Sequence, residues 1–191
     1  MEIINPATEG VIKHLKEDSA AEVSSKIAAL KEGQIKWAHV PLEERIAIIK
    51  KYGDLVMNNL EELALLLTSE TGKPIQQAKN EITGAQNRIA HIQKDALKYL
   101  KKEVITEEGD TREEISFETL GVIANISAWN FPYNVGYNVF LYALLAGNAV
   151  AYKPSEYAAL TGLKFRELLW EAGIPKDAFE CFIGGAEVGE L

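Results

Sequence analysis

Roughly the first half of the chain alternates apolar and polar positions at the spacing of α-helices. Val23, Ile27 and Leu30 follow one another at steps of four and three residues, which places them on one helical face. Asp18 and Ser19 stand just before this run, and both residue types can accept hydrogen bonds from the free N–H groups of a first helical turn. The pattern therefore predicts a helix that starts close to Ser19 and buries this face.

Further helical segments follow in the same half. Pro41 is placed to open a second helix, because proline fits the first turn, and the helical pattern continues through Leu55–Leu67. Thr71–Pro74 (TGKP) should end it, since glycine suits a left-handed cap and proline cannot continue the hydrogen-bond ladder. A long amphipathic helix is predicted after this turn, from about Ile75 to Leu100.

The pattern changes from helical to extended at Glu103. Val104–Thr106 and Ile115–Phe117 flank the acidic segment Glu107–Asp110, which contains a glycine and predicts the turn of a β-hairpin. Because this hairpin is acidic and only weakly apolar, we expect it to protrude from the main body.

The remainder of the chain alternates short apolar runs with helical segments. This alternation is typical of βαβ units on a parallel sheet. Thr119–Tyr152 contains no charged residue, and we expect all of it to be deeply buried. The sequence thus predicts an α/β fold in which the helical first half packs on the sheet. Strands are expected at Gly121–Ser127, Ala149–Lys153 and Ala178–Ile183, and helices at Tyr133–Ala146 and Tyr157–Ala172.

Composition and charge argue against several classes of function. The 191 residues carry 20 basic and 28 acidic side chains, and this net charge of −8 argues against binding of nucleic acid or an anionic membrane surface. The uncharged stretch is long enough for a membrane span, but its five asparagine amides would be costly in lipid. The start of the chain lacks a basic and apolar signal segment, and a single cysteine suits a reducing compartment, so a cytoplasmic location is expected.

The carboxyl ends of parallel strands are where α/β proteins bind ligands, and polar residues follow two of the predicted strands. Ser127–Pro132 (SAWNFP) leads into a helix whose free N–H groups could face an anion such as a cofactor phosphate. Asn130 carries an amide that can donate to a developing oxyanion, and such donors are typically worth roughly two to three orders of magnitude in rate. On residue chemistry alone, the stronger interpretation is structural, with Trp129 in the core and Asn130 capping the helix.

Lys153–Glu156 (KPSE) forms the second candidate site, directly after the next strand. The Glu156 carboxylate can accept both hydroxyls of an adenosine ribose, and Lys153 can donate to the same ribose. The structural alternative is a solvated turn in which Ser155 caps the following helix.

The remaining candidates are weak. Gly184–Gly189 (GGAEVG) follows the last strand but lacks the spacing of the usual dinucleotide fingerprint. His14, His39 and His91 lie far apart with no ligand cluster around them, so no metal site is expected. Cys181 lies in an apolar strand, where a free cysteine is usually buried and inert, so a nucleophilic role is not expected.

Six segments, taken in order, resemble conserved motifs of the aldehyde dehydrogenase superfamily, and this resemblance covers nearly the whole chain. WNFP is the most specific match. The other segments are weak singly, but they occur in the order and at the distances expected for the family. The segments are Asn5–Thr8 (NPAT), Glu70–Pro74 (ETGKP) with Glu81-Ile82 downstream, Leu120–Val122 followed by Trp129–Pro132 (WNFP), Ala146–Val150 (AGNAV) with Lys153–Glu156, Ala172–Pro175 (AGIP), and Gly184–Gly189.

The resemblance implies roles for the matched positions. It implies a partial Rossmann-like parallel sheet that binds NAD, with NADP as the alternative, and Asn130 as the oxyanion-hole amide. The cofactor is implied to lie along the backbone of Ile126, Ser127, Ala128 and Trp129, on Lys153, Ser155 and Glu156, and against Gly185 and Gly189. Glu156 should repel a 2′-phosphate, which favours NAD.

The same resemblance implies a domain organisation and an activity. Residues 1–102 and 119–191 would form the cofactor-binding domain, incomplete at its carboxyl end, and residues 103–118 an oligomerisation hairpin of a dimer or tetramer. The implied activity is NAD(P)-dependent oxidation of a small-molecule aldehyde to a carboxylic acid. In the family, the cysteine nucleophile and the glutamate base lie in segments beyond Leu191, within a catalytic domain. We therefore expect this chain to be inactive alone.

Departures from the family pattern leave the aldehyde open. Val135 and Asn138 fall where the family's substrate tunnel is lined, so the substrate of well-known members cannot be copied. Two other functions remain as alternatives to the interpretation of the chain as part of an aldehyde dehydrogenase. One is a non-catalytic remnant or partner-binding subunit that uses the hairpin. The other is a small dinucleotide-binding module with a different activity, which would have to bind NAD by itself.

Overall fold

The computed structural model describes residues 1–191 and contains a three-stranded parallel sheet in the order β5-β6-β7, surrounded by helices. Two further strand pairs, β1-β2 and β3-β4, are antiparallel. The strands are β1 (Glu2–Ile4), β2 (Val11–His14), β3 (Glu103–Glu108), β4 (Thr111–Ile115), β5 (Val122–Ile126), β6 (Ala149–Lys153) and β7 (Phe179–Cys181). The helices are α1 (Ala20–Ala38), α2 (Leu42–Asn58), α3 (Leu60–Thr71), α4 (Ile75–Tyr99), α5 (Pro132–Leu145), the 3₁₀ turn η1 (Glu156–Ala158), α6 (Ala159–Ala172) and α7 (Ala186–Glu190).

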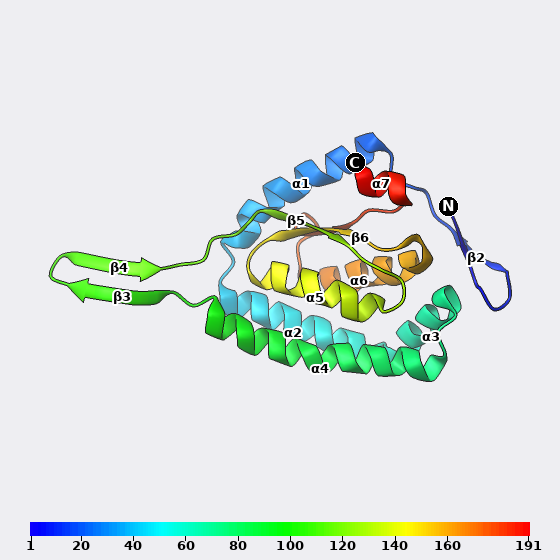
Figure 1. The fold of residues 1–191 in the computed structure, drawn as a ribbon, viewed down its shortest axis with the longest axis horizontal. Helices are drawn as coiled ribbons and strands as arrows, with labels where there is room; N and C mark the ends of the chain where they lie inside the picture. Colours follow the sequence, from blue (N-terminus) through cyan, green and yellow to red (C-terminus); the bar gives the residue numbers. More distant parts are fainter.

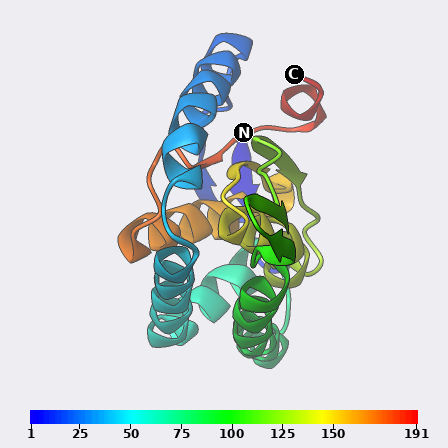
Figure 2. The ribbon, with the colours of Figure 1, turned by 90° about the vertical axis from the view of Figure 1, so that its left-hand side faces the viewer.

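The elements form layers on both sides of the sheet (Figures 1 and 2). Helix α1 packs on one face of the sheet, and α5 and α6 pack on the other. Helices α2, α3 and α4 form an outer layer against α5 and α6. The main apolar core lies in and beneath the α5–α6 layer, where Tyr52, Tyr137, Phe140 and Phe165 are fully buried. The predicted α/β class is thus confirmed.

Local signals in the sequence explain most helix ends. Ser19 caps α1 and forms a reciprocal capping box with Glu22, as its position predicted. Gly72 ends α3 in the left-handed conformation with φ 73°. The structure differs at Asn59, where the helical run expected to continue through Leu55–Leu67 breaks into α2 and α3. The Asn59 side chain donates to the Leu55 carbonyl oxygen (2.8 Å), a local bond that competes with the helical ladder.

The β3-β4 hairpin projects away from the layered body, as Figure 1 shows on its left side. Gly109, with φ 57°, and Asp110 form its two-residue turn. The second strand runs over Thr111–Ile115, so the expected strand at Ile115–Phe117 was placed too late in the sequence. Thr106 is half-buried, and every other residue of the two strands is exposed.

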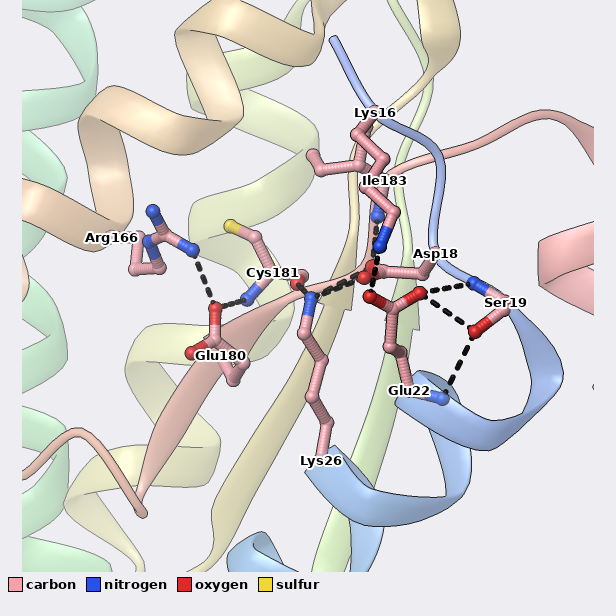
Figure 3. Close-up of polar contacts among 9 residues, drawn as sticks. All are labelled: Lys16, Asp18, Ser19, Glu22, Lys26, Arg166, Glu180, Cys181 and Ile183. Carbon is pink, nitrogen blue, oxygen red and sulfur yellow. Dashed lines mark hydrogen bonds and ion pairs between the residues drawn. The ribbon is translucent and has the colours of Figure 1, made fainter.

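Side chains cover the outer edge of β7, the edge that does not pair with β6 (Figure 3). Lys26 Nζ donates to the carbonyl oxygen of Cys181 (2.8 Å), and both carboxylate oxygens of Asp18 accept from the same ammonium (2.9 and 2.7 Å). Asp18 Oδ2 also accepts from the Ile183 N–H (2.8 Å), and the Asp18 N–H donates to the Ile183 carbonyl oxygen (2.8 Å). One Asp–Lys pair therefore satisfies the edge at both Cys181 and Ile183.

Two more side chains complete this edge. Glu180 Oε1 accepts from the Cys181 N–H and from Arg166 Nη1, both at 2.7 Å. Trp170 Nε1 donates to the Phe179 carbonyl oxygen (2.9 Å). An edge with satisfied backbone groups offers no template to another strand. The outer edge of β7 is therefore closed by its own chain.

Strand β5 lies at the opposite edge of the sheet, and its outer side is open. The Ser127 N–H donates to the Lys153 carbonyl oxygen (3.0 Å), so odd-numbered residues of this segment bond to β6. By alternation, Val122, Ala124 and Ile126 direct their backbone groups outward, where no strand pairs with them. The Ile126 side chain is 64% exposed.

Burial of the uncharged stretch Thr119–Tyr152 is therefore uneven, and the expectation that all of it is deeply buried was wrong for β5. Leu120, just before this strand, is 86% exposed. Every residue of β6 is buried, because β6 is the central strand and has helices on both faces. The uncharged stretch includes all of β5 and the first four residues of β6, whereas burial follows the position of each strand in the sheet.

Candidate functional site

The first candidate loop, Ser127–Phe131, leaves the carboxyl end of β5 and leads into α5. Ser127 is buried, but Trp129 is 52% exposed and Asn130 is also exposed. The residue before the helix is Phe131, and no side chain caps the helix at that position. Trp129 is therefore not a core residue and Asn130 is not the N-cap, so the structural interpretation of these two residues does not hold.

The Asn130 amide has one free end. Its Oδ1 accepts from the Phe131 N–H (3.1 Å), which fixes the side chain against its own backbone. Nδ2 makes no hydrogen bond within the chain and is exposed with the rest of the residue. An amide nitrogen held in this way can donate to an oxygen that approaches from solvent.

An ion pair from the α3–α4 region holds this loop. Glu81 Oε1 accepts from the Tyr133 N–H in the first turn of α5 (2.9 Å). Lys73 Nζ forms an ion pair with Glu81 and also donates to the Asn130 carbonyl oxygen (2.7 Å). The Lys73 ammonium lies 4.1 Å from the centre of the Phe131 ring. A protein carboxylate thus occupies the Tyr133 N–H that a cofactor phosphate could have used.

The second candidate loop, Lys153–Glu156, leaves the carboxyl end of β6. Ser155 Oγ accepts from the Tyr157 N–H (3.3 Å) and caps η1, as the structural interpretation of Ser155 expected. Ser155 Oγ also donates to Glu156 Oε2 (3.3 Å). Lys153 is only 8% exposed; its ammonium donates to the Pro154 carbonyl oxygen (3.2 Å) and has no carboxylate partner.

A second buried carboxylate, that of Glu70, supports this loop from below. Its two oxygens accept from the N–H groups of Leu160 and Thr161 and from the Thr161 hydroxyl (2.9 Å), and so cap the start of α6. Burial raises the pKa of Glu70 to about 7, although these hydrogen bonds act in the opposite direction. Glu70 and Glu81 therefore each hold the helix that follows one of the candidate loops.

The two loops begin side by side and remain in contact further along. Ile126 and Lys153 are partners in the register of β5 and β6, and Trp129 contacts Tyr157 edge to face at 5.8 Å between ring centres. A cavity of about 300 Å³ lies on the α1 face of the sheet, beside Ile126 and Lys153. Its lining is largely apolar and consists of Val23, Ile27, Ala124, Ile126, Ala151, Lys153, Phe182, Val188, Gly189 and Leu191.

The structure brings together only some of the expected site residues. Ile126, Lys153 and Gly189 line this cavity, and a Cβ placed on Gly189 would lie 3.4 Å from Lys153 Cδ. Gly185 stands at the start of α7, and a Cβ placed there would meet nothing within 4 Å. Asn130 instead lines a separate depression of about 270 Å³ with Lys73 and Phe131. Ser127, Ala128, Ser155 and Glu156 line neither space.

Sequence reasoning missed the part played by Glu70, Lys73 and Glu81. All three lie in segments that resemble motifs of the family, but no role was expected for them. The available signal was the presence of charged residues at positions where the helical pattern places buried side chains, as at Glu81 on the buried face of α4.

Cys181 is buried as expected, and its thiol donates to the Gly162 carbonyl oxygen (3.3 Å). Burial raises the pKa of this thiol well above its ordinary value, which disfavours the thiolate needed for nucleophilic attack. No three His, Cys, Asp or Glu side chains gather as potential metal ligands. None of the helices has the length and apolarity that crossing a membrane requires.

Comparison with known proteins defines the class of this α/β chain. The model of the aldehyde dehydrogenase family matches residues 1–191, which is the whole chain. The chain belongs to the aldehyde dehydrogenase family.

Solved structures resemble the chain over nearly its full length. An NAD-dependent benzaldehyde dehydrogenase from Corynebacterium glutamicum is 30% identical with a TM-score of 0.90, and the match covers 100% of this chain and 42% of that one. A gamma-glutamyl-gamma-aminobutyraldehyde dehydrogenase from Burkholderia cenocepacia is 30% identical with a TM-score of 0.92, covering 100% and 39%. An NADP dependent enzyme from E. coli is 29% identical with a TM-score of 0.90, covering 98% and 39%. The chain thus spans 39–42% of the length of these proteins.

Proposed function

We propose that this chain forms the cofactor-binding part of an enzyme that oxidises an aldehyde to a carboxylic acid with NAD(P). The observation that carries the proposal is the Lys153 ammonium, buried at the wall of an apolar cavity without a carboxylate partner. A cation in such a setting is costly unless a ligand supplies further polar partners. The hydroxyl and phosphate oxygens of a dinucleotide supply them, and apolar walls suit a nucleobase.

The proposed site uses the residues expected from the sequence. Lys153 and Glu156 hold the adenosine ribose with Ser155 beside them, and Gly185 and Gly189 permit close approach of the adenine. The backbone of Ile126–Trp129 lines the nicotinamide side of the groove. Support for this arrangement comes from the shared cavity of Ile126, Lys153 and Gly189. Glu156 has no ion-pair partner, so its charge is free to repel a 2′-phosphate, and we propose NAD as the preferred cofactor.

Asn130 is proposed to supply the oxyanion donor. When bound, the nicotinamide supplies a hydride acceptor for the substrate carbon. The free Nδ2 of Asn130 would donate to the substrate oxygen while a thiolate adds to the carbonyl carbon and negative charge develops on that oxygen, before the hydride leaves. Chemistry of this kind also needs a thiolate, and the buried Cys181 is unsuited to that task. These 191 residues are therefore proposed to bind and orient without oxidising an aldehyde by themselves.

A single folded unit with a projecting hairpin is proposed as the domain organisation, in which residues 1–102 and 119–191 bind the cofactor and residues 103–118 join subunits. The support is the set of exposed apolar side chains on and next to the hairpin: Val104, Ile105, Ile115 and Phe117. Such residues on a projecting element favour contact with a second copy of the enzyme. Sedimentation of the purified protein tests this proposal, and an Ile105→Lys variant should shift it toward the monomer.

A matched pair of lysine variants tests the cofactor site. Lys153→Met removes the ammonium and keeps an apolar stem of similar length, whereas Lys94→Met removes an exposed lysine of α4. We expect Lys153→Met to weaken binding of NAD about tenfold or more, which corresponds to about 1.4 kcal/mol, and Lys94→Met to leave it unchanged. Equal affinities of the two variants, measured by calorimetric titration, would remove Lys153 from the site.

Absorbance of NADH at 340 nm tests the proposal that the chain alone does not oxidise aldehydes. The 191-residue chain, mixed with NAD and a panel of aldehydes, should form no NADH above the blank. NADH formation that depends on both the chain and an aldehyde would contradict this expectation. It would also require a nucleophile other than the buried Cys181.

A further inference from the structure

The Lys73–Glu81 pair lies directly beneath the loop that carries Asn130. Both side chains are largely buried, with 10% of Lys73 and 1% of Glu81 exposed. Each partner also makes one contact to the loop: Lys73 to the Asn130 carbonyl oxygen and Glu81 to the Tyr133 N–H. The pair thus binds the backbone of residues 130–133 at both of its ends.

We infer that Lys73 and Glu81 are positioning residues that set the direction of the Asn130 amide. The inference rests on the proposed role of Asn130 as the oxyanion donor. Neither residue needs to touch substrate, because each acts through the backbone between residues 130 and 133.

The covalent structure of this stretch transmits the constraint. Pro132 fixes its own φ angle and carries no N–H, so the backbone between the two anchor points has few free torsions. The Asn130 side chain is tied to the Phe131 N–H, so its Nδ2 follows the backbone orientation. A shift of the Asn130 carbonyl oxygen would therefore turn Nδ2 away from its present direction.

Apart from the contact between the Trp129 and Tyr157 rings, little else holds the loop in place. Trp129 is 52% exposed and Phe131 is 49% exposed, so apolar packing contributes less here than in the core. The Phe131 ring packs on the Lys73 ammonium itself, 4.1 Å from it. Removal of Lys73 would release both the carbonyl oxygen of Asn130 and the ring of its neighbour.

A buried ion pair is a poor means of gaining stability, because the desolvation of both charges offsets their attraction. The geometry here shows a different use. The carboxylate lies at the amino end of α5, where the helix dipole favours a negative charge, and it brings the ammonium within reach of the loop. The pair therefore delivers a hydrogen-bond donor to one backbone oxygen at the candidate site.

Hydrogen exchange on the 191-residue chain tests the inference without any need for activity. Lys73→Met should speed exchange of the Phe131 and Tyr133 amides about tenfold, because the loop loses one anchor. The matched control is Lys79→Met, which breaks a less buried ion pair of the same chemistry between the half-buried Lys79 and the exposed Glu61 (2.7 Å). In the control, exchange in the loop should change by less than about twofold.

The NMR signals of the Asn130 side-chain amide provide a second readout, which a purely structural role would not move. We expect these signals to shift or broaden in Lys73→Met and to stay in place in Lys79→Met. Glu81→Gln keeps an oxygen for the Tyr133 N–H but removes the charge that holds Lys73, and it should reproduce the shift at Asn130. Lys73→Arg retains a donor and should restore part of the natural signal.

These measurements keep the inference separate from the proposed function. If the signals of Asn130 and the exchange of its loop are the same in Lys73→Met and Lys79→Met while both remain folded, the positioning role is wrong. That result would stand whether or not the chain binds NAD. Conversely, a chain that binds no NAD but loses order at Asn130 in Lys73→Met would contradict the proposed function and leave the positioning role intact.

Discussion

Strands β7 and β5 are the two outer strands of one sheet, yet their free edges differ completely. At β7, the Asp18–Lys26 pair, Glu180 and Trp170 satisfy the backbone groups that β6 leaves free. At β5, the outer backbone groups have no partner strand, and the side chains of Leu120 and Ile126 are exposed. The candidate loop with Asn130 leaves from this open side. The difference indicates that the β7 side is completed by the chain itself, whereas the β5 side is available for contact with something else.

The largest effect is expected from breaking the closed edge. Asp18→Ala leaves the Ile183 N–H without an acceptor and Lys26 without its carboxylate, both in partly buried positions. We expect a loss of about 3 kcal/mol in the free energy of unfolding, measured with urea. Asp177→Ala is the control, because it breaks an exposed pair with Lys36 (3.5 Å), and it should cost less than about 0.5 kcal/mol. Similar losses in the two variants would mean that Asp18 does not hold the edge.

A slightly smaller loss is expected from disturbing the buried loop after β6. A Cβ on Gly162 would lie 2.6 Å from the Cβ and Cγ atoms of Pro154, so Gly162→Ala must displace this loop. The clash should outweigh the gain of about 1 kcal/mol in helix propensity and give a net loss of about 2 kcal/mol. Gly84→Ala, on an exposed helical position with nothing within 4 Å, should instead stabilise the chain by about 0.5–1 kcal/mol. Thermal unfolding of the two variants should therefore shift in opposite directions.

The stability of the chain should depend on pH through Glu70, which caps the start of α6 behind the loop Lys153–Glu156. Because the pKa of Glu70 is raised to about 7 in the folded chain, the folded state binds its proton more tightly than the unfolded state between pH 4.5 and pH 7. Stability due to this group is therefore highest below pH 4.5 and is lost as the pH rises toward 7. Relative to Glu70→Gln, the natural chain should lose on the order of 2 kcal/mol between pH 5 and pH 7. A constant difference between the two proteins over this range would contradict the raised pKa.

The smallest effect is expected at the open edge. Leu120→Lys changes an 86% exposed side chain just before β5, so the free energy of unfolding should stay within about 0.5 kcal/mol of the natural value. The added charge should also reduce self-association through the free edge. Urea unfolding and light scattering measure the two quantities. A loss of stability comparable to that of Asp18→Ala would show that the β5 side is not open in solution.

Local patterns predicted most of the fold. The periodicity of α1 and α4, the capping box at Ser19 and the left-handed Gly72 all depend on residues close in sequence. The break at Asn59 was missed because apolar spacing is the same on both sides of it. The exposure of β5 was missed for another reason: the order of strands in a sheet decides which one is central, and no local pattern records that order.

At the candidate site, too, local patterns predicted some residues and missed those whose partners are distant in sequence. Lys153 was predicted because the alternation of strands and helices places it at a strand end. The supporting roles of Glu70 and Glu81 were not predicted, because their hydrogen-bond partners lie 90 and 52 residues away in the sequence. Contacts over such separations follow from how the helical layer packs on α5 and α6, which only the structure provides.

We propose that the carboxyl ends of β5 and β6 form a dinucleotide site, and NMR titration of the labelled chain with millimolar NAD tests this proposal most directly. We expect the amide signals that move to belong to Ile126–Trp129, Lys153–Glu156 and Gly185–Gly189, while those of the β3-β4 hairpin stay in place. A spectrum that does not change, or whose largest changes lie away from these three segments, would contradict a dinucleotide site at these strand ends.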